Sequence, residues 1–149
     1  MSLQEQVMNE LKTAMKTKDS VALESLRAIK SALLLAQTEK GASGSLAEGE
    51  ELKLLQKLVK QRKDSAAIYK EQGRDDLAEP ELAQAAVIEK FLPKQLDEEE
   101  IVKVVERVIE QTGAESMKDM GKVMGIVSKE LSGQADGKTI STIVRSKLN

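Results

Sequence analysis

The chain has 149 residues, of which 40% are hydrophobic and 1% aromatic, and its formal net charge is −2. A core of this composition must be built from Leu, Ile, Val, Ala and Met, residues that favour helices over sheets. The absence of Cys and His excludes disulfides and thiolate nucleophiles and removes the usual general base and the commonest metal ligand. We therefore predict an all-α protein without catalytic residues, metal site or cofactor, located in the cytosol and not in a membrane.

In the first half of the chain, apolar residues recur every three or four positions, which predicts long helices. The expected helices cover about 2–17, 20–40, 47–72 and 75–92. The second of them carries leucines on several sides, which indicates a central, buried helix. We expect a glycine-rich loop over 41–49. Pro80 falls inside the fourth pattern and predicts either a helix start near Glu79 or a kink there.

Leu92-Pro93 ends the fourth helix, because a proline disfavours helical structure in the residue before it. A new amphipathic pattern then begins with a capping box of Asp97 and Glu100, and it predicts three short helices. Gly113 ends the first of them, Ser116 with Asp119 begins the second, and the third runs from Lys138 to Leu148. We predict an N-terminal helical domain of long antiparallel helices over residues 1–93 and a small three-helix C-terminal domain over 94–149.

Charge is distributed unevenly along the C-terminal part. Residues 97–116 carry seven acidic and two basic side chains, a net charge of −5, whereas residues 117–149 carry six basic and three acidic ones, a net charge of +3. Such an asymmetry says more about partners than the total charge does. The basic tail is the predicted contact surface.

Short motifs are spread over nearly the whole chain. In the C-terminal part they are Met117–Gly125, Gly133–Lys138 and Ile143–Leu148. In the N-terminal part they are Lys60–Ser65, Tyr69, Gly73-Arg74, Asp76-Leu77 and Phe91–Pro93. Together these motifs resemble the YqeY family.

The tail of that family is related to the C-terminal domain of GatB, a subunit of the amidotransferase that converts misacylated glutamyl-tRNA or aspartyl-tRNA to the amide. The GatB tail contacts tRNA. The resemblance therefore implies a helical N-terminal domain, a three-helix tail and a tRNA contact. It implies no activity, because the kinase-like catalytic domain of GatB has no counterpart in this sequence.

The second helix of the predicted C-terminal domain places lysines opposite its apolar side. They are Lys118, Lys122 and Lys129, within about 40° of one another at 100° per residue. Gly125 lies in the same row. A phosphate backbone could approach this row closely, because ammonium groups neutralise its charge and glycine leaves the helix backbone accessible. The alternative is that the lysines are merely solvated and that Gly121 and Gly125 let two helices pack closely.

The leading hypothesis is a non-catalytic RNA-binding module for tRNA or a tRNA–protein complex. Recognition would rest on shape and charge, because the chain has almost no aromatic side chains on which bases could stack. The candidate RNA-binding residues are Lys118, Lys122, Gly125, Lys129, Lys138, Arg145 and Lys147.

Two other functions remain open. A protein-interaction adaptor would dock its partner on the Met-rich side of the tail, formed by Met117, Met120 and Met124. An accessory protein of tRNA-dependent amidation, a carbon–nitrogen ligation with glutamine as amide donor, follows from the resemblance alone. The segment Gly133–Thr139 resembles a phosphate-binding loop, but it has three residues between its glycines instead of four, so a turn between helices is the better interpretation.

A secondary basic segment, Lys60, Arg62 and Lys63, lies on the third predicted helix. Arg62 falls within the apolar stripe, and an unpaired buried guanidinium is costly. We therefore expect an acidic partner within the helical bundle, and a structural salt bridge is favoured over a ligand contact. The candidate partners are Asp64, Glu71, Asp75, Asp76 and Glu89.

Overall fold

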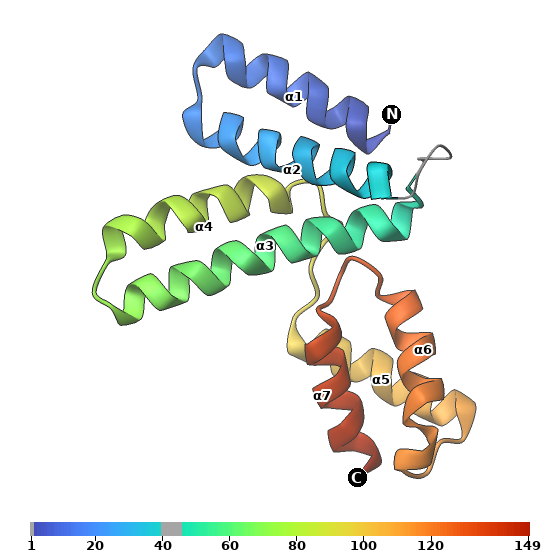
Figure 1. Cartoon of the computed structure of the whole chain (residues 1–149). Coiled ribbons are helices and arrows are strands. Elements are labelled where there is room, and N and C mark those ends of the chain that lie inside the picture. Colours follow the sequence, from blue (N-terminus) through green and yellow to red (C-terminus); the bar gives the residue numbers. More distant parts are fainter. Residues whose placement is uncertain (1, 40–45) are drawn as a thin grey trace. The chain divides into compact units, whose positions relative to one another are not determined.

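The computed structural model describes residues 2–39 and 46–149. Within these ranges the regular structure consists of seven α-helices and a short 3-10 helix, without strands (Figure 1). The predicted all-α class is confirmed. The chain folds as two compact units, Met1–Leu92 and Pro93–Asn149, which are described one at a time below.

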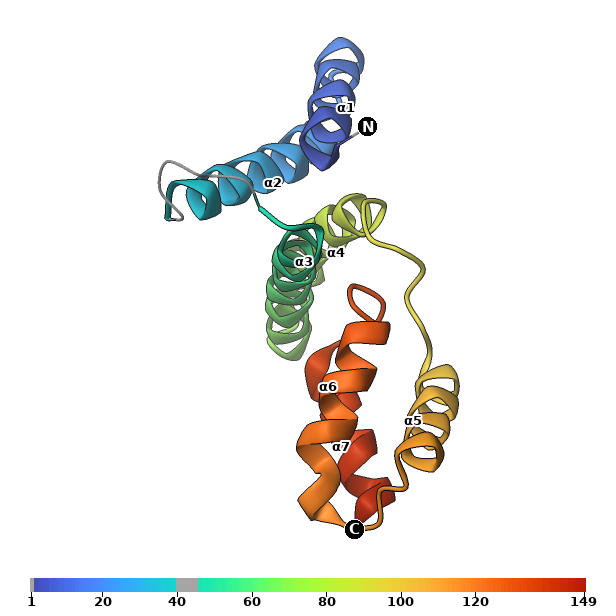
Figure 2. The same cartoon turned by 90° about the vertical axis from the view of Figure 1, so that its right-hand side faces the viewer.

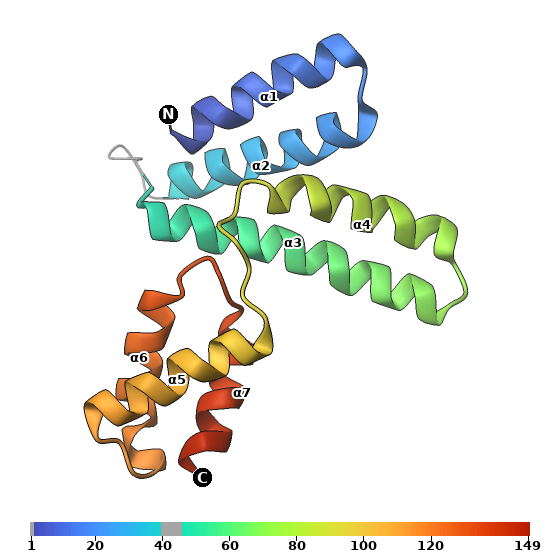
Figure 3. The same ribbon diagram turned by 180° about the vertical axis from the view of Figure 1, so that it is seen from behind.

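The N-terminal unit contains two helical hairpins, visible in Figures 1 and 3. Its helices are α1 (Leu3–Thr17), α2 (Ser20–Glu39), α3 (Glu48–Glu71) and α4 (Asp75–Glu89). Because α2 contacts all three others, its apolar side joins the hairpins, with Leu26, Ile29 and Leu33 at most 2% exposed. The prediction of burial on several sides is wrong for Leu34 and Leu35, which are 60% and 62% exposed.

The ends of these helices follow from their capping residues. Ser2 and Glu5 form a capping box at the start of α1, and the Asp19 carboxylate accepts a hydrogen bond of 3.1 Å from the Ala22 backbone N–H at the start of α2. Both devices satisfy backbone donors that have no partner within the helix. Of the predicted glycine-rich loop 41–49, residues 41–45 lie outside the described residues, and Gly49 is already part of α3.

Pro80 lies inside α4, which begins at Asp75. The predicted helix start near Glu79 is therefore wrong, although the alternative start at Asp75 is confirmed. A proline within a helix removes one backbone hydrogen bond, but Ala78 and Ala85 on either side of it are 0% and 1% exposed in the N-terminal unit. Packing of this kind, rather than local propensity, supplies most of the stability of a helix in a protein.

The C-terminal unit contains α5 (Glu98–Thr112), the 3-10 helix η2 (Met117–Asp119), α6 (Met120–Glu130) and α7 (Gly137–Leu148). The three α-helices contact one another in pairs, and Figure 2 shows them as a small bundle. Its core is aliphatic, with Val105, Val123, Val127 and Val144 each 0% exposed. The predicted starting residues Asp97 and Ser116 both cap their helices.

The segment before α5 is fixed to the connection between α6 and α7. The Leu96 backbone N–H donates to the Gln134 carbonyl oxygen at 2.9 Å, and the Gln95 side-chain amide donates to the Gly133 carbonyl oxygen at 2.6 Å. The Gln134 side-chain amide in turn donates to the Lys94 carbonyl oxygen at 3.3 Å. Residues 94–96 therefore belong to the C-terminal unit and close its open end.

The helix end at Gly113 gives a direct test of this unit. Gly113 has a φ of +67°, a left-handed conformation that ends α5, so Gly113→Ala should lower the free energy of unfolding by about 1 kcal/mol. Gly121 lies in α6 with open space where a Cβ would stand, so Gly121→Ala should instead be neutral or stabilising by up to about 1 kcal/mol. Urea unfolding followed by circular dichroism measures both, and equal effects of the two substitutions would contradict the assignment of Gly113.

Candidate nucleic-acid interface

Two valines decide which side of α6 faces outward. Val123 and Val127 are 0% exposed and lie in a core formed with residues of α5 and α7. Met120 and Met124 are partly buried against the same core. The predicted apolar side of α6 is confirmed, and the opposite side is left facing away from the core.

Lysines occupy this outward side. Lys118 lies on η2, Lys122 and Lys129 lie on α6, and all three are exposed. Nowhere in residues 2–39 and 46–149 does a carboxylate lie within ion-pair distance of any of them. The continuous α-helix predicted from Met117 is wrong in its first turn, which is a 3-10 turn of about three residues, so Lys118 is rotated relative to its predicted position.

The glycines of α6 are not explained by helix packing. Gly121 and Gly125 are both exposed, and an ideal Cβ at either position would meet no atom within 4 Å. The alternative that they let two helices pack closely is therefore wrong. A glycine in an exposed helix costs about 1 kcal/mol relative to alanine, and here it leaves the backbone of α6 bare beside the lysines.

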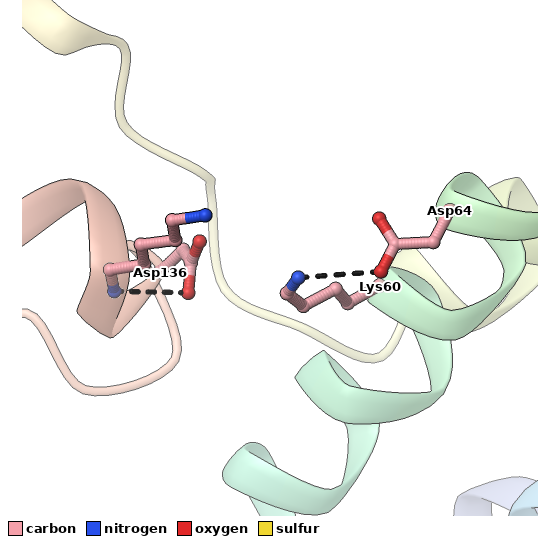
Figure 4. Close-up of polar contacts among 4 residues, drawn as sticks. Lys60, Asp64 and Asp136 are labelled. Atoms are coloured by element: carbon pink, nitrogen blue, oxygen red, sulfur yellow. Dashed lines mark hydrogen bonds and ion pairs between the residues drawn. The ribbon is translucent and has the colours of Figure 1, made fainter. Parts of the chain in front are cut away.

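The remaining candidate cations lie on α7. Lys138 and Arg145 are exposed, two helical turns apart on the same side of the helix, and no carboxylate of the described chain pairs with either. The Lys147 ammonium group is 2.9 Å from a carboxylate oxygen of Glu106, so this lysine is already engaged. Figure 4 shows Asp136 at the start of α7, where its carboxylate accepts from the Lys138 backbone N–H at 3.3 Å.

The Met-rich side considered for a protein partner is largely turned inward. Met120 and Met124 pack against the core of their own unit, whereas Met117 is 41% exposed. Replacing Met120 by a charged residue would therefore disturb the core and would not report on a partner. Met117 with Ile126, which is 39% exposed, is the apolar surface that remains outside.

Arg62 is held by a relay of neutral and charged groups instead of a direct salt bridge. Its Nε donates to the Gln84 side-chain oxygen at 3.1 Å, and the Gln84 amide nitrogen donates to a Glu24 carboxylate oxygen at 2.9 Å. Its Nη1 also donates to the Leu58 carbonyl oxygen at 3.1 Å. The relay joins α2, α3 and α4, and the structure pairs Arg62 with none of the five predicted acidic partners.

The secondary basic segment is therefore not one surface. Arg62 is half-buried, Lys63 lies 2.6 Å from a carboxylate oxygen of Glu89, and Lys60 lies 3.3 Å from a carboxylate oxygen of Asp64 (Figure 4). Sequence reasoning passed over Lys53 and Lys57, which are exposed on the same helix. The signal that could have found them is the stretch 53–63, which contains five cations and no acid.

No three carboxylate side chains in the described ranges are grouped so as to hold a metal ion. Among the helices described, none is long and apolar enough to cross a membrane. The predictions that the protein has no catalytic residues and no cofactor stay predictions.

The sequence was compared with protein families. The family described as Yqey-like protein matches residues 4–148. The chain belongs to the YqeY family. The predicted resemblance is thereby confirmed over nearly the whole sequence.

Curated relatives of this YqeY chain are of two kinds. A glutamyl-tRNA(Gln) amidotransferase subunit of Thermococcus gammatolerans is 38% identical over 46% of this chain and 12% of its own length. Altered inheritance of mitochondria protein 41 of Clavispora lusitaniae is 40% identical over 60% of this chain and 53% of its own length, and that of Pyrenophora tritici-repentis is 31% identical over 85% and 69%. The chain thus spans a small part of the first relative and about half of the second.

The names of the fungal relatives place them in mitochondria. For this YqeY chain, the cytosolic location predicted from composition stays a prediction.

The YqeY motif residues in the N-terminal unit shape the turn between α3 and α4. Gly73 has a φ of +72°, which ends α3, and the Arg74 guanidinium binds the Asp76 carboxylate through two hydrogen bonds of 3.1 Å. This contact lowers the pKa of Asp76 and raises the pKa of Arg74. These motif residues therefore have a structural role at the start of α4.

The relay through Arg62 can be tested in the full YqeY chain. Gln84→Met removes both hydrogen bonds that connect Arg62 to Glu24, and we expect the free energy of unfolding to fall by about 1–3 kcal/mol. Gln61→Met is the control, because Gln61 is exposed on α3 and its change should stay within about 0.5 kcal/mol. Urea unfolding measures both variants. A Gln84 variant as stable as the control would show that the relay contributes nothing.

Proposed function

We propose that the protein is a non-catalytic RNA-binding module that holds tRNA through the phosphate backbone. The observation that carries the proposal is the outward side of α6, where Lys118, Lys122 and Lys129 stand exposed and without carboxylate partners in the described chain. Lysines that no acid neutralises are available to displace counterions from a phosphate backbone.

The bare backbone of α6 supports the same proposal. With open space above Gly125, a phosphate group can come close to the helix while the lysines on either side neutralise its charge. Lys138 and Arg145 on α7 add two further cations of the same unit. Lys147 contributes less, because binding would compete with its contact to Glu106.

The relatives suggest which RNA to test first. One of them is named as a subunit of the glutamyl-tRNA(Gln) amidotransferase, so tRNA(Gln) is the first ligand to test. A role beside tRNA-dependent amidation is the setting in which such binding would act. The proposal assigns no amidation chemistry to this chain.

Charge reversal tests the basic side of α6. We expect the full chain to bind tRNA with an affinity that falls with salt at a slope equivalent to about three to five phosphate contacts. Lys118→Glu with Lys122→Glu and Lys129→Glu should weaken binding at least tenfold and reduce that slope by about three. Fluorescence anisotropy with labelled tRNA(Gln), repeated at several salt concentrations, measures both quantities.

A matched control separates local contacts from general charge. Changing Lys12, Lys16 and Lys30 to Glu alters three exposed lysines of α1 and α2 and gives the same formal net charge, −8, as the first variant. We expect this control to retain most of the affinity. Equal losses in the two variants would mean that total charge and not α6 governs binding, and no binding by the parent chain would refute the proposal.

Gly125→Ala distinguishes function from stability. Because a Cβ at this position has open space, the substitution should stabilise the C-terminal unit by up to about 1 kcal/mol. If phosphate approaches the helix backbone there, the same substitution should weaken tRNA binding several-fold. Urea unfolding and anisotropy on one protein preparation test both effects. A stabilised variant with unchanged affinity would exclude a close approach at Gly125.

A further inference from the structure

The longest acid-free basic stretch of the N-terminal unit lies on α3. Residues 53–63 contain five cations and no carboxylate, and the structure divides these cations into two groups. Arg62 is turned into the relay with Gln84, and Lys63 is paired with Glu89. The other three lysines, Lys53, Lys57 and Lys60, are exposed; we call them the α3 lysine row.

The spacing of the α3 lysine row places its members on one side of the helix. Positions 53, 57 and 60 fall within about 60° of one another at 100° per residue, and they span about 10 Å along the axis. No carboxylate in the described ranges lies within ion-pair distance of Lys53 or Lys57. The contact of Lys60 with Asp64 is exposed on both sides, and such pairs are worth at most about 1 kcal/mol, so a phosphate can replace it.

The surroundings of the row favour a phosphate backbone over other polyanions. Gln56 and Gln61, next to the row, are uncharged, and the row contains no aromatic side chain that could stack on a base. The apolar side of α3 is buried, with Leu55 0% and Val59 7% exposed. A helix that binds a membrane surface needs a free apolar side beside its cations, and α3 has none next to this row.

We propose that the α3 lysine row is a second contact for the phosphate backbone of the same RNA, in the other unit from the basic side of α6. This inference rests on the proposed function and extends it. Two contacts on separately folded units of one chain make the second binding step intramolecular, so the affinity of the whole exceeds that of either unit. The RNA must then be long enough to reach both, which a folded tRNA is and a short oligonucleotide is not.

The experiment changes Lys53, Lys57 and Lys60 to Glu in the full chain and measures tRNA(Gln) binding by fluorescence anisotropy across a salt series. We expect affinity to fall at least tenfold and the salt slope to fall by about two to three. The variant of Lys12, Lys16 and Lys30 again serves as the control, because it has the same net charge and lies in the same unit. Circular dichroism establishes that both variants are folded.

The outcomes separate this inference from the proposed function. If the parent chain binds and the α3 variant equals the control, the second contact is refuted while the α6 contact stands. If the α6 variant binds like the parent and the α3 variant does not, the proposed site in the tail is refuted and the α3 lysine row stands. A parent chain that binds no RNA refutes both.

A lipid arm tests the competing ligand. Vesicles of phosphatidylserine and phosphatidylcholine should bind the parent chain and the α3 variant equally weakly. Vesicle binding that depends on the α3 lysine row, together with unchanged tRNA binding, would overturn the proposal in favour of an anionic membrane surface.

Discussion

Burial of Val123 and Val127 is the constraint on which the account of the C-terminal unit depends. Fully burying a side chain of this size contributes about 1.5–3 kcal/mol, and both valines lie in the core shared with α5 and α7. With that side of α6 fixed, the lysines and glycines of the helix must face outward. The basic surface is thus a consequence of packing, and any change that rotates α6 would remove it.

In the N-terminal unit, packing sorts cations that look equivalent in the sequence. Arg62 lies among apolar residues and is satisfied by a glutamine that connects it to Glu24 on another helix. The neighbouring Lys63 is held by Glu89. What remains exposed is a regular row of lysines on α3, so the polar interior of the unit determines which charges are left for a ligand.

Much of the fold could be predicted because its signals are local. The caps at Ser2, Asp97 and Ser116 and the left-handed glycine at Gly113 mark helix ends within one turn of the chain. Contacts between distant residues could not be predicted in this way. The partner of Arg62 is Gln84, 22 residues away, and the continuation of α4 through Pro80 reflects packing that no local pattern contains. The solvent exposure of Leu34 and Leu35 likewise depends on where the other helices lie.

The central claim is that tRNA contacts the outward side of α6, and an NMR titration of the isotope-labelled full chain with tRNA tests it most directly. The account predicts that the backbone amide signals of Gly121 and Gly125 shift or broaden early in the titration, together with those of the neighbouring lysines. Signals from the buried side of α6 should change less. Perturbations confined to other surfaces, with the amides of Gly121 and Gly125 unchanged at saturation, would contradict the account.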